Sequence, residues 1–247
     1  MAQSPDPAPP LPGAPPVMTG NLMAVGSMVV WAAGFPAAER LLATWNPLAL
    51  VSARFLVAIL ILVPAWLALD GVQALRTARW GHGTLVGSLA FGAGAYLLIL
   101  AQWLTDPVTV AIIAAASPIA ATLVEMVYER RRLRPAFIVG LLASLVGGVV
   151  ATGGGGSPHF GAGAALAVVS SVLFAWGSYL TVRDFPDLSV IGRTTITLSG
   201  GLLATGTTYL AAYALGIVPA PAHPFDPTGL GLLVIYGVGG MALSQFL

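Results

Sequence analysis

Two long apolar runs, separated by a dense cluster of charge, occupy the middle of the chain. The runs are Val108–Tyr128 and Pro135–Thr152, and the cluster between them contains Glu129, Arg130, Arg131, Arg132 and Arg134. A helical apolar segment of about 20 residues matches the roughly 30 Å hydrocarbon core of a bilayer. Because arginines are costly at the bilayer centre, this cluster must lie at a membrane surface.

The composition predicts an all-α integral membrane protein. Of 247 residues, 57% are hydrophobic and 8% are charged, whereas a soluble domain carries about 25% charged residues. The net charge of +1 offers no surface for nucleic acid. The chain has neither lysine nor cysteine. This excludes a retinal Schiff base, a disulfide and a thiolate metal site.

Eight apolar runs follow a proline-rich N-terminal tail. They are about twice as long as a tilted membrane strand requires and lack its alternating pattern, which favours helices. We place the runs at Gly20–Leu42, Leu48–Leu69, Thr84–Leu104, Val108–Tyr128, Pro135–Thr152, Gly161–Val182, Leu188–Ala214 and Thr228–Leu247.

The arginines are divided unequally between the two ends of these runs. If successive runs cross the bilayer in alternate directions, one face receives eight of the ten basic residues and the other receives Arg40 and Arg54. The arginine-rich face is cytoplasmic by the positive-inside rule. We therefore expect a multi-pass protein of the plasma membrane with a cytoplasmic N-terminus.

The sequence contains an internal repeat. Ala24–Arg40 aligns with Ala167–Arg183, so that Gly34 pairs with Gly177. The residues before Arg54 resemble those before Arg193, and Leu89–Tyr96 resembles Val234–Met241 with two glycines in register. These matches occur in the same order at a nearly constant offset. They predict a duplicated unit.

The repeated unit contains five helices, so the second copy must enter the membrane upside down. Such inverted repeats are typical of secondary transporters. We expect a disordered tail over residues 1–18, the first repeat over 19–153, a Gly-rich linker over 154–160 and the second repeat over 161–247. Because the second copy stops within its third helix, we expect eight transmembrane helices of a complete set of ten.

Several motifs resemble the EamA-like members of the drug/metabolite transporter superfamily. Trp31 and Phe35 resemble the W-x-x-x-F pattern of that family, and Pro47 with Arg54 resembles its second-helix pattern. The remaining similarity lies in Ala115–Pro118, Glu129, Gly140 and Gly147–Gly148. The resemblance implies a helical bundle around a central cavity. It also implies alternating access and the export or exchange of small metabolites, such as amino acids or drug-like compounds.

Two alternatives stay open beside this interpretation. The chain could be a non-transporting membrane fragment or packing partner from a truncated transporter. A homodimer is also compatible with the sequence. We expect no enzymatic activity and no cofactor or metal, because no metalloprotease, nucleophile-elbow or phosphate-loop motif occurs and the three histidines lie in loops. The expected partners are a small-molecule substrate and the lipid bilayer.

The fourth run contains three candidate functional residues. Pro118 interrupts the helical hydrogen bonds near mid-membrane, so it is either a hinge or a tolerated kink. Ser117 beside it could bind substrate or cap the interrupted helix. Glu125 lies closer to the arginine cluster, where it could couple protons or form an ion pair.

Aromatic and polar residues of other runs complete the predicted site. Gln102 needs a polar partner inside the membrane and is a candidate for lining the pathway. Arg54 and Arg193 occupy equivalent repeat positions one or two turns inside apolar runs. A buried guanidinium there could bind a carboxylate, but because both residues lie near run ends we expect them to reach the head groups instead. The aromatic candidates for substrate binding, which could equally serve packing, are Trp31, Tyr96, Trp176 and Tyr179.

Overall fold

The structure is a computed structural model that describes residues 17–130, 138–140, 143, 147, 161–222 and 226–243. Within these ranges the chain is helical and contains no strand, which confirms the predicted all-α class. The fifth run, Pro135–Thr152, lies mostly outside the described residues. So do the arginines that follow Arg130 in the charge cluster, the expected linker, and residues 1–16 of the expected tail.

Four helices begin at side-chain caps that are visible in the sequence. They are α3 (Pro47–Thr77), α6 (Pro107–Ala115), α10 (Val190–Ala214) and α11 (Pro227–Val234). In each case the preceding side-chain oxygen accepts a backbone N–H of the first turn, which would otherwise lack a partner. For α3 this is the Leu48 N–H, 2.9 Å from the Asn46 side chain. The caps are Asn46, Asp106, Ser189 and Asp226.

Two of the predicted runs are broken helices. The first run consists of α1 (Val17–Ala32) and α2 (Gly34–Leu42), which are separated at Ala33. The fourth run consists of α6 and α7 (Ser117–Glu129), which are bent by 40°. This bend lies at Ala116, directly before the first turn of α7 that contains Pro118. Proline is tolerated in a first turn, where its missing N–H costs nothing, so a break here fits the sequence.

The third run of each predicted repeat contains a π-helical segment. The first has α4 (Trp80–Val86), η1 (Gly87–Gly92) and α5 (Ala93–Leu104). The second has α11 followed by η2 (Ile235–Leu243). Between them in the chain lies α9 (Ala162–Asp184). π-Helical segments are rare, and they often occur at functional sites.

Among the described residues, three helical stretches are long and apolar enough to cross a membrane, or four if α6 and α7 form one span. The three are α3, the continuous stretch Trp80–Leu104, and α9. The broken first run and the short stretch Pro227–Gly239 fall below this length. The helix α10 carries several threonines, whose hydroxyl groups bond to carbonyls within the same helix, as Thr195 does to Ile191 at 2.7 Å.

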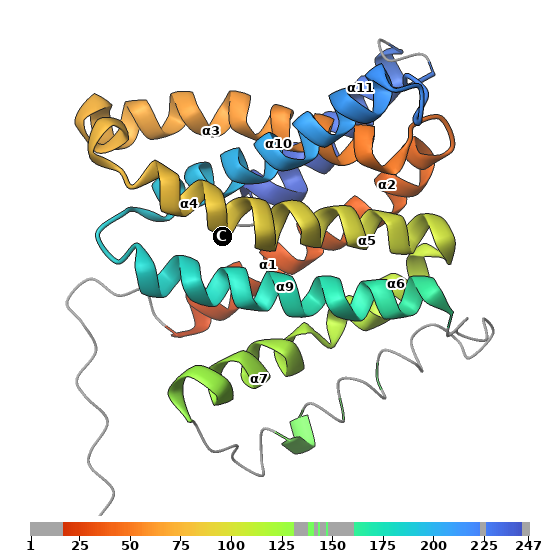
Figure 1. Ribbon diagram of the computed structural model, residues 1–247. Helices are drawn as coiled ribbons and strands as arrows, with labels where there is room; N and C mark the ends of the chain where they lie inside the picture. Colours follow the sequence, from red (N-terminus) through yellow and green to blue (C-terminus); the bar gives the residue numbers. More distant parts are fainter. Residues whose placement is uncertain are drawn as a thin grey trace, which may run out of the picture.

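The helices pack in layers around α5 (Figure 1). On one side α10 packs against α3, η1 and α4; on the other, α9 packs against α5, and α7 lies on the far side of α9. Glycines of α10 receive aromatic rings of α3. A Cβ atom at Gly201 would lie 2.8 Å from the Phe55 ring, and one at Gly192 would lie 3.0 Å from Trp66. Small residues therefore allow these two helices to approach closely.

The same helix α10 forms a second close contact, with α4 and η1. A Cβ atom at Gly87 would collide with the carbonyl group of Thr197, and one at Gly200 would collide with the backbone of Thr84. Beside them, the Ser88 hydroxyl donates to the Gly200 carbonyl at 2.9 Å. We call this contact between α4–η1 and α10 the glycine seam.

Replacing Gly87 with alanine is expected to destabilise the protein. The added methyl group would meet backbone atoms of Thr197, which cannot rotate away as a side chain can. Overpacking of this kind costs about 1–3 kcal/mol. Thermal unfolding of the purified protein in detergent measures the loss.

Gly81→Ala is the matched control, because Gly81 lies in the adjoining helix α4 and a Cβ atom there has open space. Its unfolding temperature should stay the same or rise slightly, since alanine favours helix over glycine. Equal unfolding temperatures for the two variants would contradict the tight seam.

Candidate functional site

A pocket lies where the first three runs meet the last one. The hollow measures about 240 Å³ when the open solvent in front of it is included, and its enclosed part, about 10 Å³, has room for about one water molecule. It is bounded by α1, α2, α3 and α5 from the first half of the chain and by η2 from the second half. The lining residues are Trp31, Gly34, Phe35, Arg54, Leu98, Ile99, Gln102 and Tyr236.

Arg54 provides the charge of this pocket. It lies two turns into α3, and its residue is only 4% exposed. Its Nη1 donates to the Tyr236 hydroxyl at 2.7 Å, and its Cζ lies 4.1 Å from the centre of the Tyr236 ring. The ring face and the hydroxyl therefore both stabilise the guanidinium, and a cation over a desolvated ring gains about 2 kcal/mol.

Gln102 provides a fixed hydrogen-bond acceptor. Its Nε2 donates to the Phe35 carbonyl at 2.9 Å, which determines the orientation of the amide. The residue is 4% exposed, and its Oε1 has no hydrogen-bond partner among the described residues. Buried polar atoms are almost always satisfied by protein, water or ligand. This oxygen therefore marks a place where a donor is needed.

The rest of the lining is apolar. The Trp31 and Phe35 rings meet edge to face, with centroids 5.0 Å apart. The side chains of Leu98 and Ile99 complete this wall from α5. A few polar groups in a mainly apolar hollow are typical of small-molecule sites.

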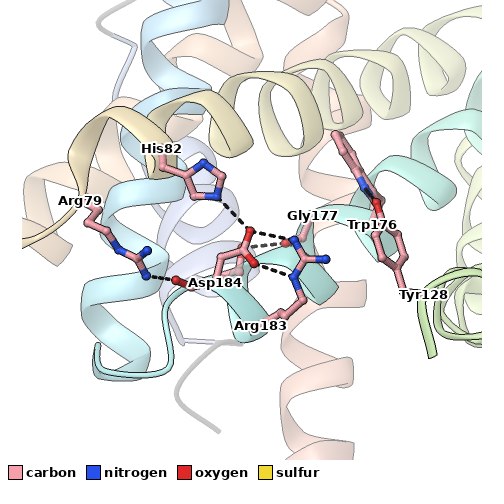
Figure 2. A network of polar contacts seen from close by, with 8 residues as sticks. Arg79, His82, Tyr128, Trp176, Gly177, Arg183 and Asp184 are labelled. Atoms are coloured by element: carbon pink, nitrogen blue, oxygen red, sulfur yellow. Dashed lines mark hydrogen bonds and ion pairs between the residues drawn. The ribbon is translucent and has the colours of Figure 1, made fainter.

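A polar network lies at the opposite end of the bundle, where α9 ends and α4 begins (Figure 2). Asp184 is at its centre. Its carboxylate oxygens lie 2.9 Å from His82 Nε2 and 2.6 Å from Arg183 Nε, and its backbone carbonyl accepts a hydrogen bond from Arg79. We call these four residues the Asp184 network. It connects α9 with α4 and the residue that precedes α4.

Aromatic side chains join α7 to the same end of α9. Trp176 Nε1 donates to the Tyr128 hydroxyl at 3.0 Å, as Figure 2 shows. The Tyr128 and Tyr179 rings lie 4.9 Å apart, and the Arg183 guanidinium lies over both. Trp176 and Tyr179 are therefore contacts between α7 and α9.

The predicted site residues do not lie together: some line the pocket and others lie near the Asp184 network. Trp31 and Gln102 lie in the pocket, whereas Trp176 and Tyr179 lie near the Asp184 network. The remaining ones line neither: Tyr96 is half-buried in α5, Glu125 is half-buried in α7, and Ser117 and Pro118 are exposed at the bend.

Arg54 was expected to reach the head groups, and this prediction is wrong. The structure buries its side chain against Tyr236, a residue 182 positions away in the sequence. Arg193, its repeat counterpart, is half-buried and donates to the carbonyls of Leu188 and Pro186 near the start of α10, at 2.9 Å each. One sequence signal pointed to Arg54. It lies seven positions after Pro47, the first residue of α3, which corresponds to a rise of about 10 Å along the helix.

Tyr236 was also missed. The repeat alignment places it opposite Phe91, so the second copy has a hydroxyl group where the first copy has none. Such a difference between two aligned apolar segments marks a position with a polar role.

Comparison with known proteins supports the fold. Residues 18–153, more than half of the chain, match the EamA-like transporter family. A solved structure described only as a crystal structure of a protein is 21% identical in sequence, with a TM-score of 0.66. The match covers 93% of this chain and 78% of the other. No curated protein sequence matches significantly.

Proposed function

Because the chain belongs to the EamA-like transporter family, we propose that it is a secondary transporter that exports or exchanges small metabolites, such as amino acids or drug-like compounds, by alternating access. Family membership makes it a multi-pass membrane protein whose environment is lipid and whose partner is a small molecule. The observation that carries the proposal is the pocket around Arg54 and Gln102, two buried polar residues in an apolar helical bundle.

The position of the pocket supports this function. Its walls come from the first predicted repeat, except for Tyr236, which comes from the second. Secondary transporters with inverted repeats bind substrate between the copies, and a movement of one copy against the other exposes the site to each side in turn. A ligand touching both Arg54 and Tyr236 would contact both copies.

Two equivalent contacts support the inverted repeat itself. A Cβ atom at Gly34 would lie 3.0 Å from the Tyr236 ring, and one at Gly177 would lie 3.0 Å from the Phe91 ring. The sequence aligns Gly34 with Gly177 and Phe91 with Tyr236. Each contact is therefore the counterpart of the other with the copies exchanged. Both rings also belong to π-helical segments.

The opposite end of the bundle supplies the second gate of the proposed mechanism. There the glycine seam brings α4 and η1 against α10, and the Asp184 network ties α4 to α9. Alternating access requires this end to open when the pocket end closes. Of the remaining predicted site residues, we assign Pro118 and Ser117 to the bend between α6 and α7, which is a place where the bundle can flex.

We place the N-terminus in the cytoplasm and the protein in the plasma membrane. Five arginines of the described residues lie at the end of the bundle that carries the Asp184 network, which supports a cytoplasmic location for that end. The pocket then opens toward the outer face. The five arginines are Arg76, Arg79, Arg130, Arg183 and Arg193.

Transport by the full chain in proteoliposomes tests the proposal. We expect uptake of at least one labelled amino acid or small metabolite, by exchange against the same compound inside, without ATP. Empty liposomes are the control. Absence of uptake across the whole panel by correctly inserted protein would contradict the transport function.

Glu125→Gln is expected to abolish the dependence of transport on a pH gradient while leaving exchange without a gradient intact. We propose that Glu125 carries the coupled proton, because it is a half-buried carboxylate within the apolar helix α7. Glu129→Gln is the control, since Glu129 is exposed at the end of the same helix. Unchanged gradient dependence in Glu125→Gln would reject this role.

Opening of the glycine seam can be followed with a single cysteine, since the native sequence contains none. Ser88→Cys places a thiol in the seam, where we expect slow reaction with maleimide. Adding Asp184→Asn should accelerate labelling several-fold, because α9 then loses the carboxylate that holds His82 of α4. Asp187→Asn, an exposed change at the same end, should leave the rate unaltered. Equal rates for the two backgrounds would exclude the Asp184 network as a gate.

A further inference from the structure

We propose that the pocket holds one ordered water molecule in the conformation of this structure, and that this water joins the two predicted repeats. The water donates a hydrogen bond to Gln102 Oε1 and accepts one from the Tyr236 hydroxyl. The inference concerns how the pocket is filled and held together, and it does not depend on the transport function.

The buried amide of Gln102 creates the need for a donor. Because its Nε2 donates to the Phe35 carbonyl at 2.9 Å, the amide cannot turn round without losing that bond. Its Oε1 is buried and has no hydrogen-bond partner in the described part of the chain. Buried acceptors are almost always satisfied by protein or by ordered water. Since no described side chain donates to this oxygen, we infer that its donor lies in the pocket.

Tyr236 supplies the second partner from the other side of the pocket. Its hydroxyl oxygen accepts a hydrogen bond from Arg54 Nη1 at 2.7 Å. A guanidinium group has no acceptor, so the proton of the Tyr236 hydroxyl must be donated elsewhere. It does not go directly to Gln102, whose Oε1 receives no protein donor among the described residues. Both residues line the same hollow, where one small molecule can accept from the first and donate to the second.

The size and charge of the pocket select water. The enclosed part of the hollow, about 10 Å³, has room for about one water molecule, so a metabolite can enter only after the pocket widens. A cation is disfavoured by the Arg54 guanidinium, since the described lining contains no carboxylate. An anion is disfavoured at Gln102, because Oε1 is an acceptor. A neutral molecule that both donates and accepts meets these conditions.

The water connects elements of both predicted repeats. Gln102 lies in α5 of the first copy, and Tyr236 lies in η2 of the second. The bridge adds a polar link across this interface, beside the direct bond from Arg54 to Tyr236. The equivalent contact with the copies exchanged, between Gly177 and the Phe91 ring, offers no hydroxyl group. We therefore expect the bridge on one side of the repeat only.

Radiolytic labelling of the purified full chain in detergent tests the site. A short X-ray pulse forms hydroxyl radicals from water, and a radical formed from a bound water oxidises the side chains that touch it. Mass spectrometry then gives the oxidation rate of each aromatic residue. We expect Tyr236 to be oxidised several-fold faster than Phe55, which is also buried but packs tightly against Gly201.

Gln102→Leu removes the acceptor while keeping an apolar side chain in its place. The oxidation rate of Tyr236 should fall several-fold, because a hollow with too few polar partners stays dry. Gln73→Leu is the matched control: it makes the same chemical change at an exposed position of α3, outside the pocket, and should leave the rate unaltered. Each variant is first required to elute as a single species with an unfolding temperature near that of the native protein.

An experimental structure of the native chain, at a resolution that shows ordered water, tests the same site without any variant. We expect one water within hydrogen-bond distance of both Gln102 Oε1 and the Tyr236 hydroxyl. A map that shows waters elsewhere in the bundle but none bonded to both groups would overturn the proposal. So would an oxidation rate of Tyr236 that is the same in the native chain and in Gln102→Leu. Neither measurement involves transport, so failure of the water site leaves the transport function standing, and absence of transport leaves the water site standing.

Discussion

Hydrocarbon offers no hydrogen bonds, so each polar group inside the bilayer must find its partner within the protein. Threonines of α10 meet this requirement locally, by bonding to carbonyls of the preceding turn. Arg54 and Gln102 meet it over long distances in the sequence, through Tyr236 and the Phe35 carbonyl. These bonds join helices whose apolar faces alone would not determine their relative rotation, since lipid is as apolar as leucine. The pocket exists where these bonds converge.

Local signals in the sequence predict much of the fold. The membrane class follows from composition, and the starts of α3, α6 and α11 follow from an Asn-Pro or Asp-Pro pair. The bend in the fourth run follows from Pro118. The break at Ala33 has a similar signal, because Gly34 follows it directly and Pro36 lies in the first turn of α2, where it has no N–H to donate to the Ala32 carbonyl.

The candidate site was only partly predictable. Trp31 and Gln102 stand out as polar or amphipathic groups inside apolar runs, and the pocket contains both. Trp176 and Tyr179 have the same appearance in the sequence but lie against Tyr128 at the other end of the bundle. The neighbours that the Trp176 and Tyr179 side chains contact depend on which helix packs against α9. For Arg54, burial and access to the head groups are equally compatible with its position, and the partner that decides between them lies in the last described helix.

The π-helical segments affect which side chains point into the pocket. A π turn closes over one residue more than an α turn, so everything beyond it faces about 100° away from where an unbroken α-helix would aim it. Gln102 follows η1, and Tyr236 lies within η2. A deletion of a single residue in η1 would leave composition and hydrophobicity almost unchanged but would turn the Gln102 side chain away from the pocket. In evolution, η1 should therefore keep its length even where its residues outside the glycine seam change.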